Sequence, residues 1–455
     1  MKERKMIVFI EEWIEQNSKE IVDLSREIYN YAELAHEETK SMQALERYLA
    51  KYGFAIEDNC GLDTAFKAVW GSGKPIIGFL GEYDALPGLA QKPIPQYDCD
   101  INKPGHGCGH NLLGAGSAAA AVALKSYLEK TEQQGTVVYY GCPAEEVMEG
   151  KIIMAEHGCF QELDCALAWH PNIRNRAGGA SNQAIDMVKF DFFGKTAHAA
   201  TAPYLGRSAL DAAELMNVGV NYLREHVTKD VSMHYSYLAA GDKPNIVPAY
   251  ASVWYFIRAA NRDNCTDATN RIVDIARGAA LMTGTKMKCN FSARGYNGLP
   301  NFTIGHLAEE NFDKIGTHIF SDEDKKFAAD LALSLGNSPE TSILDESVTP
   351  ISKTNEVIFA EGSTDVSDVS QITPTINLHV TCAPKNTPSH HWAFAACAGS
   401  SIGQKGMLLA AKVLAQTGAD LIENESLLMQ AKEEFQTNAP GWVALEREIS
   451  DPDTH

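Results

Sequence analysis

Apolar positions recur with a helical period at the start of the chain and again further along it. Between Ile7 and Tyr31 an isoleucine or leucine returns every three, four or seven residues, as on the buried face of a helix. Later helical stretches are separated by short apolar runs that have the length of buried strands. Because strands and helices alternate, the pattern predicts an α/β domain with a mainly parallel central sheet flanked by helices. The expected helices are Ile7–Tyr31, Lys40–Tyr52, Leu112–Lys130 and Lys151–His157, and the expected strands are Ala65–Trp70, Pro75–Leu80, Thr136–Tyr140 and Ala166–Trp169.

The pattern changes near Ile185. Polar and apolar residues alternate over Asp186–Gly194, as in a half-buried strand, and Ser208 is well placed to cap the helix that follows. We expect a small α+β domain, residues 185–298, inserted into a main domain that is made of residues 1–184 and 299–455. The further elements expected are helices Ser208–Leu223, Ala268–Thr283, Leu307–Gly316 and Asp322–Ser334, strands Ser232–Leu238, Tyr250–Ile257 and Lys286–Ser292, a loop over 336–356, and a final helix Ile402–Thr417.

Length and charge limit the function. A chain of 455 residues exceeds one ordinary hydrophobic core, which supports the expectation of separate domains. The formal net charge of −20 repels nucleic acids and anionic membranes, so neither is expected as a partner. No apolar run approaches the roughly 20 residues of a membrane-spanning helix. The ten cysteines are irregularly spaced, without a Cys-x-x-Cys pair, which favours a cytoplasmic protein with reduced thiols.

The segment GHGCGHNLLGAG places a thiol and two imidazoles on a glycine-rich loop. Cys108 and His110 are two residues apart, so both side chains of an extended loop point the same way and suit one metal cluster. His106 is a weaker candidate. The alternatives are a buried thiol beside a loop histidine, or a redox-active thiol. No resolving cysteine lies nearby in the sequence, which argues against redox chemistry.

Two neighbouring acids in CPAEE, Glu145 and Glu146, follow an expected strand. Acids in this position often stabilise the start of a helix by interaction with its dipole. A hydrolytic metal site, however, requires both a carboxylate ligand and a separate general base, and adjacent acids on an irregular segment can divide these tasks.

Histidines and one more acid complete the candidate set. His170 ends another expected strand and is either a ligand or an ordinary core histidine. His390 and His391 are adjacent, so their side chains diverge and one of them is expected to reach the metal. Glu82 and Asp84 follow a third strand; Asp84 is either a turn former or the partner that orients a ligand imidazole.

These motifs, in this order, resemble the metal-dependent aminoacylase/carboxypeptidase family of zinc peptidases, and more closely its amidohydrolase branch. The resemblance runs from about Glu27 to Leu414. Within the branch, STDVSDVS and TPSHHW resemble the p-aminobenzoyl-glutamate hydrolase group. The segments that carry the resemblance are GEYDALPGLAQ, GHGCGHNLLGAG, CPAEE, WHP, GKTAHAA, NIVPAYASVWYFIR and HHWAF.

The resemblance implies a site with two divalent metal ions, zinc or manganese (Zn²⁺ or Mn²⁺). A thiolate favours zinc, whereas carboxylates also permit manganese. Glu145 would be the general acid/base, and Asp84 would support a ligand from behind. His390 is preferred to His391 because Phe394 matches a family His-x-x-x-Phe ending. The implied ligands are Cys108, His110, Glu146, His170 and His390.

The inserted domain would be a lid and dimerisation domain that makes a homodimer. From it, His198 would polarise the scissile carbonyl as a catalytic residue, while Asn245 and Arg258 would hold the amide and the α-carboxylate of the substrate. The expected reaction is hydrolysis of an N-acyl or N-aroyl amino acid. A dipeptidase for β-alanyl dipeptides and a metal-binding relative without catalysis are the alternatives. Whether a second, related subunit is required stays open.

Overall fold

The computed structural model describes residues 2–58, 60–341, 343–360 and 362–449, which fold as two compact units. Each unit is assembled from segments that are distant in the sequence. The first unit comprises the chain up to Ala180, Leu299–Ile358 and Asp368–Trp442, and the second comprises Ser181–Gly298, Phe359–Ser367 and the chain from Val443 onward.

The first unit is built on a mixed sheet with the strand order β1-β2-β6-β3-β7-β16-β8-β14. Its central strands β6, β3, β7 and β16 are parallel to one another, while β1 and β2 are antiparallel additions at one edge. The predicted mainly parallel sheet is confirmed. The strands are β1 (Ala55–Asp58), β2 (Phe66–Ser72), β3 (Ile76–Glu82), β6 (Gly135–Cys142), β7 (Cys165–Asn172), β8 (Asn175–Arg176), β14 (Val348–Thr349) and β16 (Thr375–Thr381).

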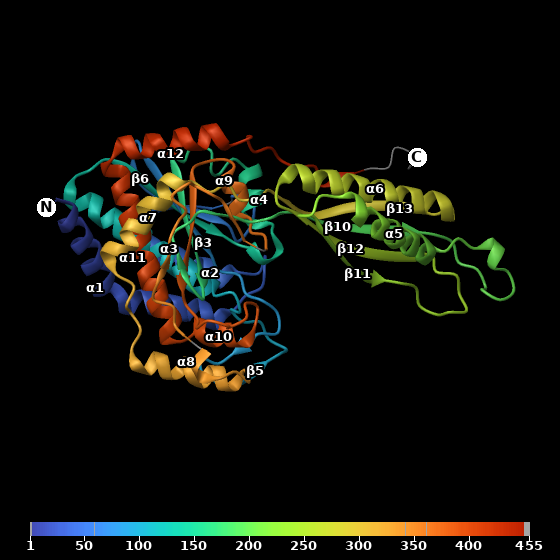
Figure 1. The fold of residues 1–455 in the computed structure, drawn as a ribbon, viewed down its shortest axis with the longest axis horizontal. Helices are drawn as coiled ribbons and strands as arrows, with labels where there is room; N and C mark the ends of the chain where they lie inside the picture. The colour runs from blue at the N-terminus through green and yellow to red at the C-terminus, as the bar shows by residue number, and fades with distance from the viewer. Residues whose placement is uncertain (1, 59, 342, 361, 450–455) are drawn as a thin grey trace. The chain divides into compact units, whose positions relative to one another are not determined.

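Helices flank this sheet. Helix α3 lies against β3, β6 and β7, and α11 lies beside α3 and against β7 and β16 (Figure 1). The alanine-rich sequence of α3 explains the close packing, because its small side chains are buried and let neighbouring backbones approach. The helices are α1 (Lys2–Tyr31), α2 (Thr39–Lys51), α3 (His110–Thr131), α4 (Gly150–Glu156), α7 (Phe302–Ile315), α8 (Asp322–Ser334), α10 (Trp392–Ala398), α11 (Ser401–Glu423) and α12 (Glu425–Asn438).

The second unit is an antiparallel sheet with the order β11-β12-β10-β13-β17, packed against two helices. The hydroxyl of Ser208 accepts a hydrogen bond from the Asp211 N–H at 3.1 Å, so the predicted helix cap is confirmed. The elements are β10 (Ala184–Phe193), α5 (Ala209–Leu223), β11 (Ser232–Ala239), β12 (Tyr250–Ala259), α6 (Arg262–Thr283), β13 (Lys286–Gly295) and β17 (Glu448–Ile449).

Some elements differ from the expectation. Strand β16 was not predicted, because Asn377 and His379 interrupt its apolar pattern. The expected loop over 336–356 contains the short strand β14, and its residue 342 lies outside the described residues. Ile402–Thr417 was wrongly predicted as the final helix, because α12 follows it and buries only Leu428 and Ala431. Short elements are β4 (Ala90–Gln91), β5 (Cys99–Asp100), β9 (Ala180–Ser181), β15 (Ile358–Phe359) and α9 (Val366–Ser370).

The helices were also compared with the requirements of a membrane span. Within the described ranges, none of them combines the length and the apolar composition needed to cross a membrane.

Glycine at position 406 sets the contact between α11 and β16. A Cβ added to Gly406 would lie 2.4 Å from the carbonyl oxygen of Thr381, so the helix and the strand would have to separate. We expect Gly406→Ala to lower the free energy of unfolding by about 1–3 kcal/mol, seen as a lower thermal midpoint in calorimetry. The control is Gly278→Ala in α6, where a Cβ meets no heavy atom within 4 Å and alanine stabilises a helix by roughly 0.5–1 kcal/mol. A midpoint that rises in both variants would contradict this packing.

Candidate metal centre

The carboxyl ends of three parallel strands bring the predicted residues to one edge of the first unit's sheet. Register pairs the last residues of β3 and β6, and β7 runs parallel beside β3. Glu82 ends β3 and Asp84 follows it, Glu145 and Glu146 follow β6, and His170 lies in β7 near its end. Ligands of α/β sheets are generally bound at this edge.

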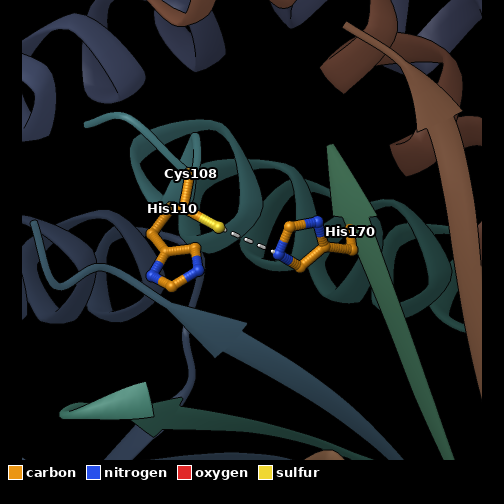
Figure 2. Close-up of side chains that lie close together, drawn as sticks. All are labelled: Cys108, His110 and His170. Carbon is orange, nitrogen blue, oxygen red and sulfur yellow. Dashed lines mark hydrogen bonds between the residues drawn. The ribbon is translucent and has the colours of Figure 1, made fainter. Parts of the chain in front are cut away.

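A tight turn before α3 supplies a thiol and an imidazole. Gly109 lies between Cys108 and His110 in the left-handed region, with φ 81°, and a Cβ there would lie 3.1 Å from the Pro171 ring. The turn therefore favours glycine. The Cys108 Sγ lies 3.3 Å from the His170 Nε2, and the rings of His110 and His170 are 5.8 Å apart and nearly perpendicular (Figure 2).

Asp84 joins two segments of the cluster. Its Oδ1 lies 2.7 Å from the His110 Nδ1, and its Oδ2 accepts a hydrogen bond from the Glu146 N–H at 2.9 Å. Since Asp84 and His110 are both buried, a proton shared at Nδ1 leaves the Nε2 lone pair directed away from Asp84. This is the usual arrangement behind a metal-binding histidine.

Carboxylates surround the other nitrogen of His110. Its Nε2 lies 3.3 Å from Glu82 Oε2, 3.8 Å from Glu145 Oε2 and 4.0 Å from Glu146 Oε1. The fully buried ammonium of Lys151 lies 2.6 Å from the other oxygen of Glu82. One ammonium does not balance so many acids, so the centre has a strongly negative potential.

Burial and charge shift the pKa values of these groups in a consistent way. Burial raises the pKa of the Cys108 thiol, and burial raises the pKa of Glu146 to about 7. Burial opposes a charged imidazole, yet Cys108 and Asp84 outweigh it and hold the pKa of His110 well above its ordinary value. The surroundings therefore favour an added positive charge. Divalent metals supply that charge and require deprotonated ligands.

The donor atoms fit a metal. Within the described residues, His110 Nε2, Glu82 Oε2 and Glu146 Oε1 are buried and have no hydrogen-bond partner. Three sets of side chains each place their donor atoms within 4.8 Å of one another, and Cys108 belongs to two of these sets. Thiolate, imidazole and carboxylate suit zinc, and the carboxylates also suit manganese. The sets are Cys108, His110 and His170; Cys108, Glu146 and His390; and Glu82, His110 and Glu145.

The two adjacent histidines before α10 take different positions. His390 has a left-handed backbone, with φ 52°, and its Nε2 lies 3.4 Å from Glu146 Oε2. His391 instead accepts a hydrogen bond from the Ala393 N–H at 3.3 Å and caps α10. Only His390 of this pair belongs to the candidate metal sets. His106, the weaker candidate, is buried with its Nε2 3.1 Å from the Ile28 carbonyl oxygen and is in none of them.

The turn that holds Glu145 and Glu146 is a single 3-10 turn between two left-handed residues, Ala144 and Met148. The start of α4 lies further on, at Gly150, so the two acids do not form its first turn. The buried Glu38 holds the turn, because its carboxylate accepts a hydrogen bond from the Ala144 N–H at 2.8 Å. Burial raises the pKa of Glu38 to about 7.

The residues predicted to contact substrate from the inserted domain belong to the second unit. Backbone pairing of 197–199 with 245–247 makes His198 and Asn245 neighbours, and both side chains are exposed. Arg258 lies in β12, half-buried, with its guanidinium 5.2 Å from the ring centroid of Phe256. Their catalytic and binding roles stay predictions.

Sequence reasoning assigned no role to several residues that the fold brings to this centre. Glu82 had a visible signal, because it shares a strand face with Asp84 two residues on. Lys151 had none, since a lysine in a short helix is ordinarily exposed. Arg176 and His379 meet across β8 and β16, and the latter strand was not predicted.

A parallel sheet whose carboxyl edge gathers a thiol, imidazoles and buried carboxylates defines a metal-dependent hydrolase of the α/β class. Sequence comparisons make this specific. One of the subunits of p-aminobenzoyl-glutamate hydrolase from Escherichia coli (strain K12) is 37% identical, with 94% of each chain covered. The Xaa-Arg dipeptidase of Mus musculus is 31% identical, covering 93% of this chain and 91% of its own. Residues 181–281 match the peptidase dimerisation domain.

Solved structures share the fold. The aminobenzoyl-glutamate utilization protein from Klebsiella pneumoniae superposes with a TM-score of 0.64 at 15% identity, covering 90% of this chain and 98% of its own. A dinuclear metal binding peptidase of the M20 family from Bacillus subtilis gives 0.58 at 17% identity, covering 90% and 99%. The chain belongs to the M20 family of peptidases, and the resemblance inferred from its motifs is confirmed.

Removing the charge of Asp84 tests its orienting role. We expect Asp84→Asn to weaken metal binding by about 10- to 100-fold, because the His110 ring loses the carboxylate that fixes its orientation. Metal content after dialysis and calorimetric titration with zinc or manganese measure the effect. Asp23→Asn removes the same charge from α1, where Asp23 pairs only with its helical neighbours Lys19 and Arg26, and serves as the control. Equal affinities in the wild type and Asp84→Asn would rule out this role.

Proposed function

We propose that this protein hydrolyses the amide bond of an N-acyl or N-aroyl amino acid of the p-aminobenzoyl-glutamate type. The proposal includes two divalent ions, Zn²⁺ or Mn²⁺, held by Cys108, His110, Glu146, His170 and His390. Family membership supports amide hydrolysis, and the 37% identity to one chain of a p-aminobenzoyl-glutamate hydrolase supports the substrate class.

One observation carries the mechanism: Glu145 and Glu146 are adjacent in sequence, but their oxygens belong to different donor sets. Glu146 is grouped with Cys108 and His390, whereas Glu145 lies on the side of His110 and Glu82. A left-handed residue at each end of the turn produces this divergence. One acid is therefore available as a ligand and the other for proton transfer.

When bound, divalent ions polarise the amide carbonyl and lower the pKa of water at the site. The rest of the mechanism belongs to side chains of this chain. Glu145 accepts the proton of the attacking water and delivers it to the leaving amine. Asp84 and Lys151 hold His110 and Glu82 in place. Burial keeps bulk water from screening these charges.

The lid residues complete the proposal. We assign polarisation of the scissile carbonyl to His198, the substrate amide to Asn245 and the α-carboxylate to Arg258, which suits a planar, bidentate partner. The match of 181–281 to a peptidase dimerisation domain supports a homodimer formed through the inserted domain 185–298. The Escherichia coli relative is named as one of several subunits, which leaves room for a second, related chain here. A cytoplasmic location remains part of the proposal.

A dipeptidase is the second candidate, because the Xaa-Arg dipeptidases of Mus musculus and Homo sapiens are 31% and 30% identical over 93% of this chain. A site that binds metal without catalysis is the third. Purified protein loaded with zinc or manganese, assayed with p-aminobenzoyl-glutamate, Ala-Arg and β-alanyl-lysine, separates the three. We expect release of p-aminobenzoate. Cleavage of the dipeptides alone would replace our proposal, and no cleavage in either metal form would refute it.

Glu145 is the test residue for the mechanism. We expect Glu145→Gln to retain bound metal but to lose roughly 10²- to 10⁴-fold in kcat, the range for a positioned proton-transfer group. Metal analysis and steady-state kinetics measure the two properties on one preparation. Glu149→Gln is the control, because Glu149 lies just beyond the same turn and pairs with the half-exposed His36 instead of the cluster. Near-normal turnover of Glu145→Gln would assign the proton transfer elsewhere.

A further inference from the structure

A buried arginine beside the metal centre has no acidic partner. Arg176 in β8 is 8% exposed, and its Nε is buried without a hydrogen-bond partner in the described part of the chain. No ion pair with a carboxylate of the described residues is formed by its guanidinium, and its nearest charged neighbour is another arginine, Arg174. Burying an unpaired cation costs free energy, so such groups are ordinarily paired.

The contacts of Arg176 orient it without neutralising it. Its Nη2 lies 3.1 Å from the Nδ1 of His379, which is its cross-strand partner in β16. The Nδ2 of Asn172 lies 3.3 Å from the same nitrogen. Both neighbours are donors, so Nδ1 of His379 carries the lone pair and Nε2 carries the proton. Burial and the charge of Arg176 hold the pKa of His379 well below its ordinary value, which keeps the ring neutral.

This pair adjoins the candidate metal ligands within the first unit. His379 is level with His170 in the parallel register of β16 and β7, and their ring centroids are 6.4 Å apart. His170 in turn contacts Cys108 at 3.3 Å. One imidazole thus separates the guanidinium from the metal centre. A ligand of amino-acid size at the centre would bring its side chain close to Arg176.

We propose that Arg176, oriented by His379, binds the side-chain carboxylate of the amino acid that the enzyme releases. This inference rests on the proposed function and specifies its substrate as an N-acylated acidic amino acid. An acidic amino acid carries two carboxylates, and Arg258 in the second unit is assigned to the α-carboxylate only. The unpaired donors of Arg176 supply the charge and the planar geometry that a second carboxylate needs.

The test compares p-aminobenzoyl-glutamate with p-aminobenzoyl-glutamine, which differ only in this carboxylate. We expect the wild type to prefer the glutamate compound, and Arg176→Gln to raise its KM by roughly 10- to 100-fold, as for the loss of a charge-assisted hydrogen-bonded pair. The KM for the glutamine compound should change by less than about twofold, since a neutral amide loses little. Arg176→Lys should lie between, because lysine keeps the charge but not the planar fork.

Stability and a control residue separate binding from structure. Because Arg176 is an unpaired buried charge, its removal should leave the thermal midpoint unchanged or raised, whereas loss of a structural partner would lower it. Arg174→Gln removes an equal charge from an exposed neighbouring position and should not alter the preference between the substrates. Equal losses for both substrates in Arg176→Gln, or the same effect from Arg174→Gln, would overturn the inference.

Binding without turnover gives an independent result. Calorimetric titration of free glutamate and glutamine into the wild type and Arg176→Gln should show a loss of affinity for glutamate alone. If the wild type cleaved neither substrate, the proposed function would fail, while this titration would still decide the role of Arg176. Unchanged glutamate affinity in Arg176→Gln would reject it.

Discussion

Repulsion between acids held together in a buried site is the constraint on which this structure depends. Glu82, Asp84, Glu145 and Glu146 meet around one imidazole, with the Cys108 thiol beside them. In a medium of low dielectric such a concentration of negative charge is costly unless cations balance it. Lys151 supplies one positive charge, and His110 supplies a second only while it is protonated. The balance is completed by divalent ions, which is why the fold and the chemistry are inseparable here.

The backbone makes this arrangement possible by placing rigid strand ends beside strained turns. Parallel β3, β6 and β7 deliver their final residues to one edge, where no further strand residue competes for the space. Left-handed residues at Gly109 and Ala144 then redirect the chain within a residue or two. Asp84 joins the two turns by holding the His110 ring and the Glu146 backbone with one carboxylate. A shift of either turn would therefore be transmitted to both.

Charge is distributed in opposite ways at two scales. The whole chain carries a formal net charge of −20, which opposes the approach of anions from a distance. Next to the metal centre, Arg174, Arg176 and His379 form a local region without a neighbouring carboxylate in the described residues. Divalent ions would add further positive charge there. An anionic substrate is thus attracted only at close range, where the geometry of the guanidinium also selects its shape.

The sequence by itself determined the class of fold, the inserted α+β segment and the metal-ligand candidates, because these depend on local periodicity and on donor side chains next to strand ends. It also showed Cys108 and His110 as a pair, since two residues of one short turn cannot lie far apart. Only the tertiary structure decided that His390 lies near Glu146 while His391 caps a helix, that β16 joins the centre of the sheet, and that Lys151 and Arg176 are buried. These features arise from contacts between segments far apart in the chain. No local pattern encodes which of two adjacent side chains turns inward, or which cation is left without its counter-charge.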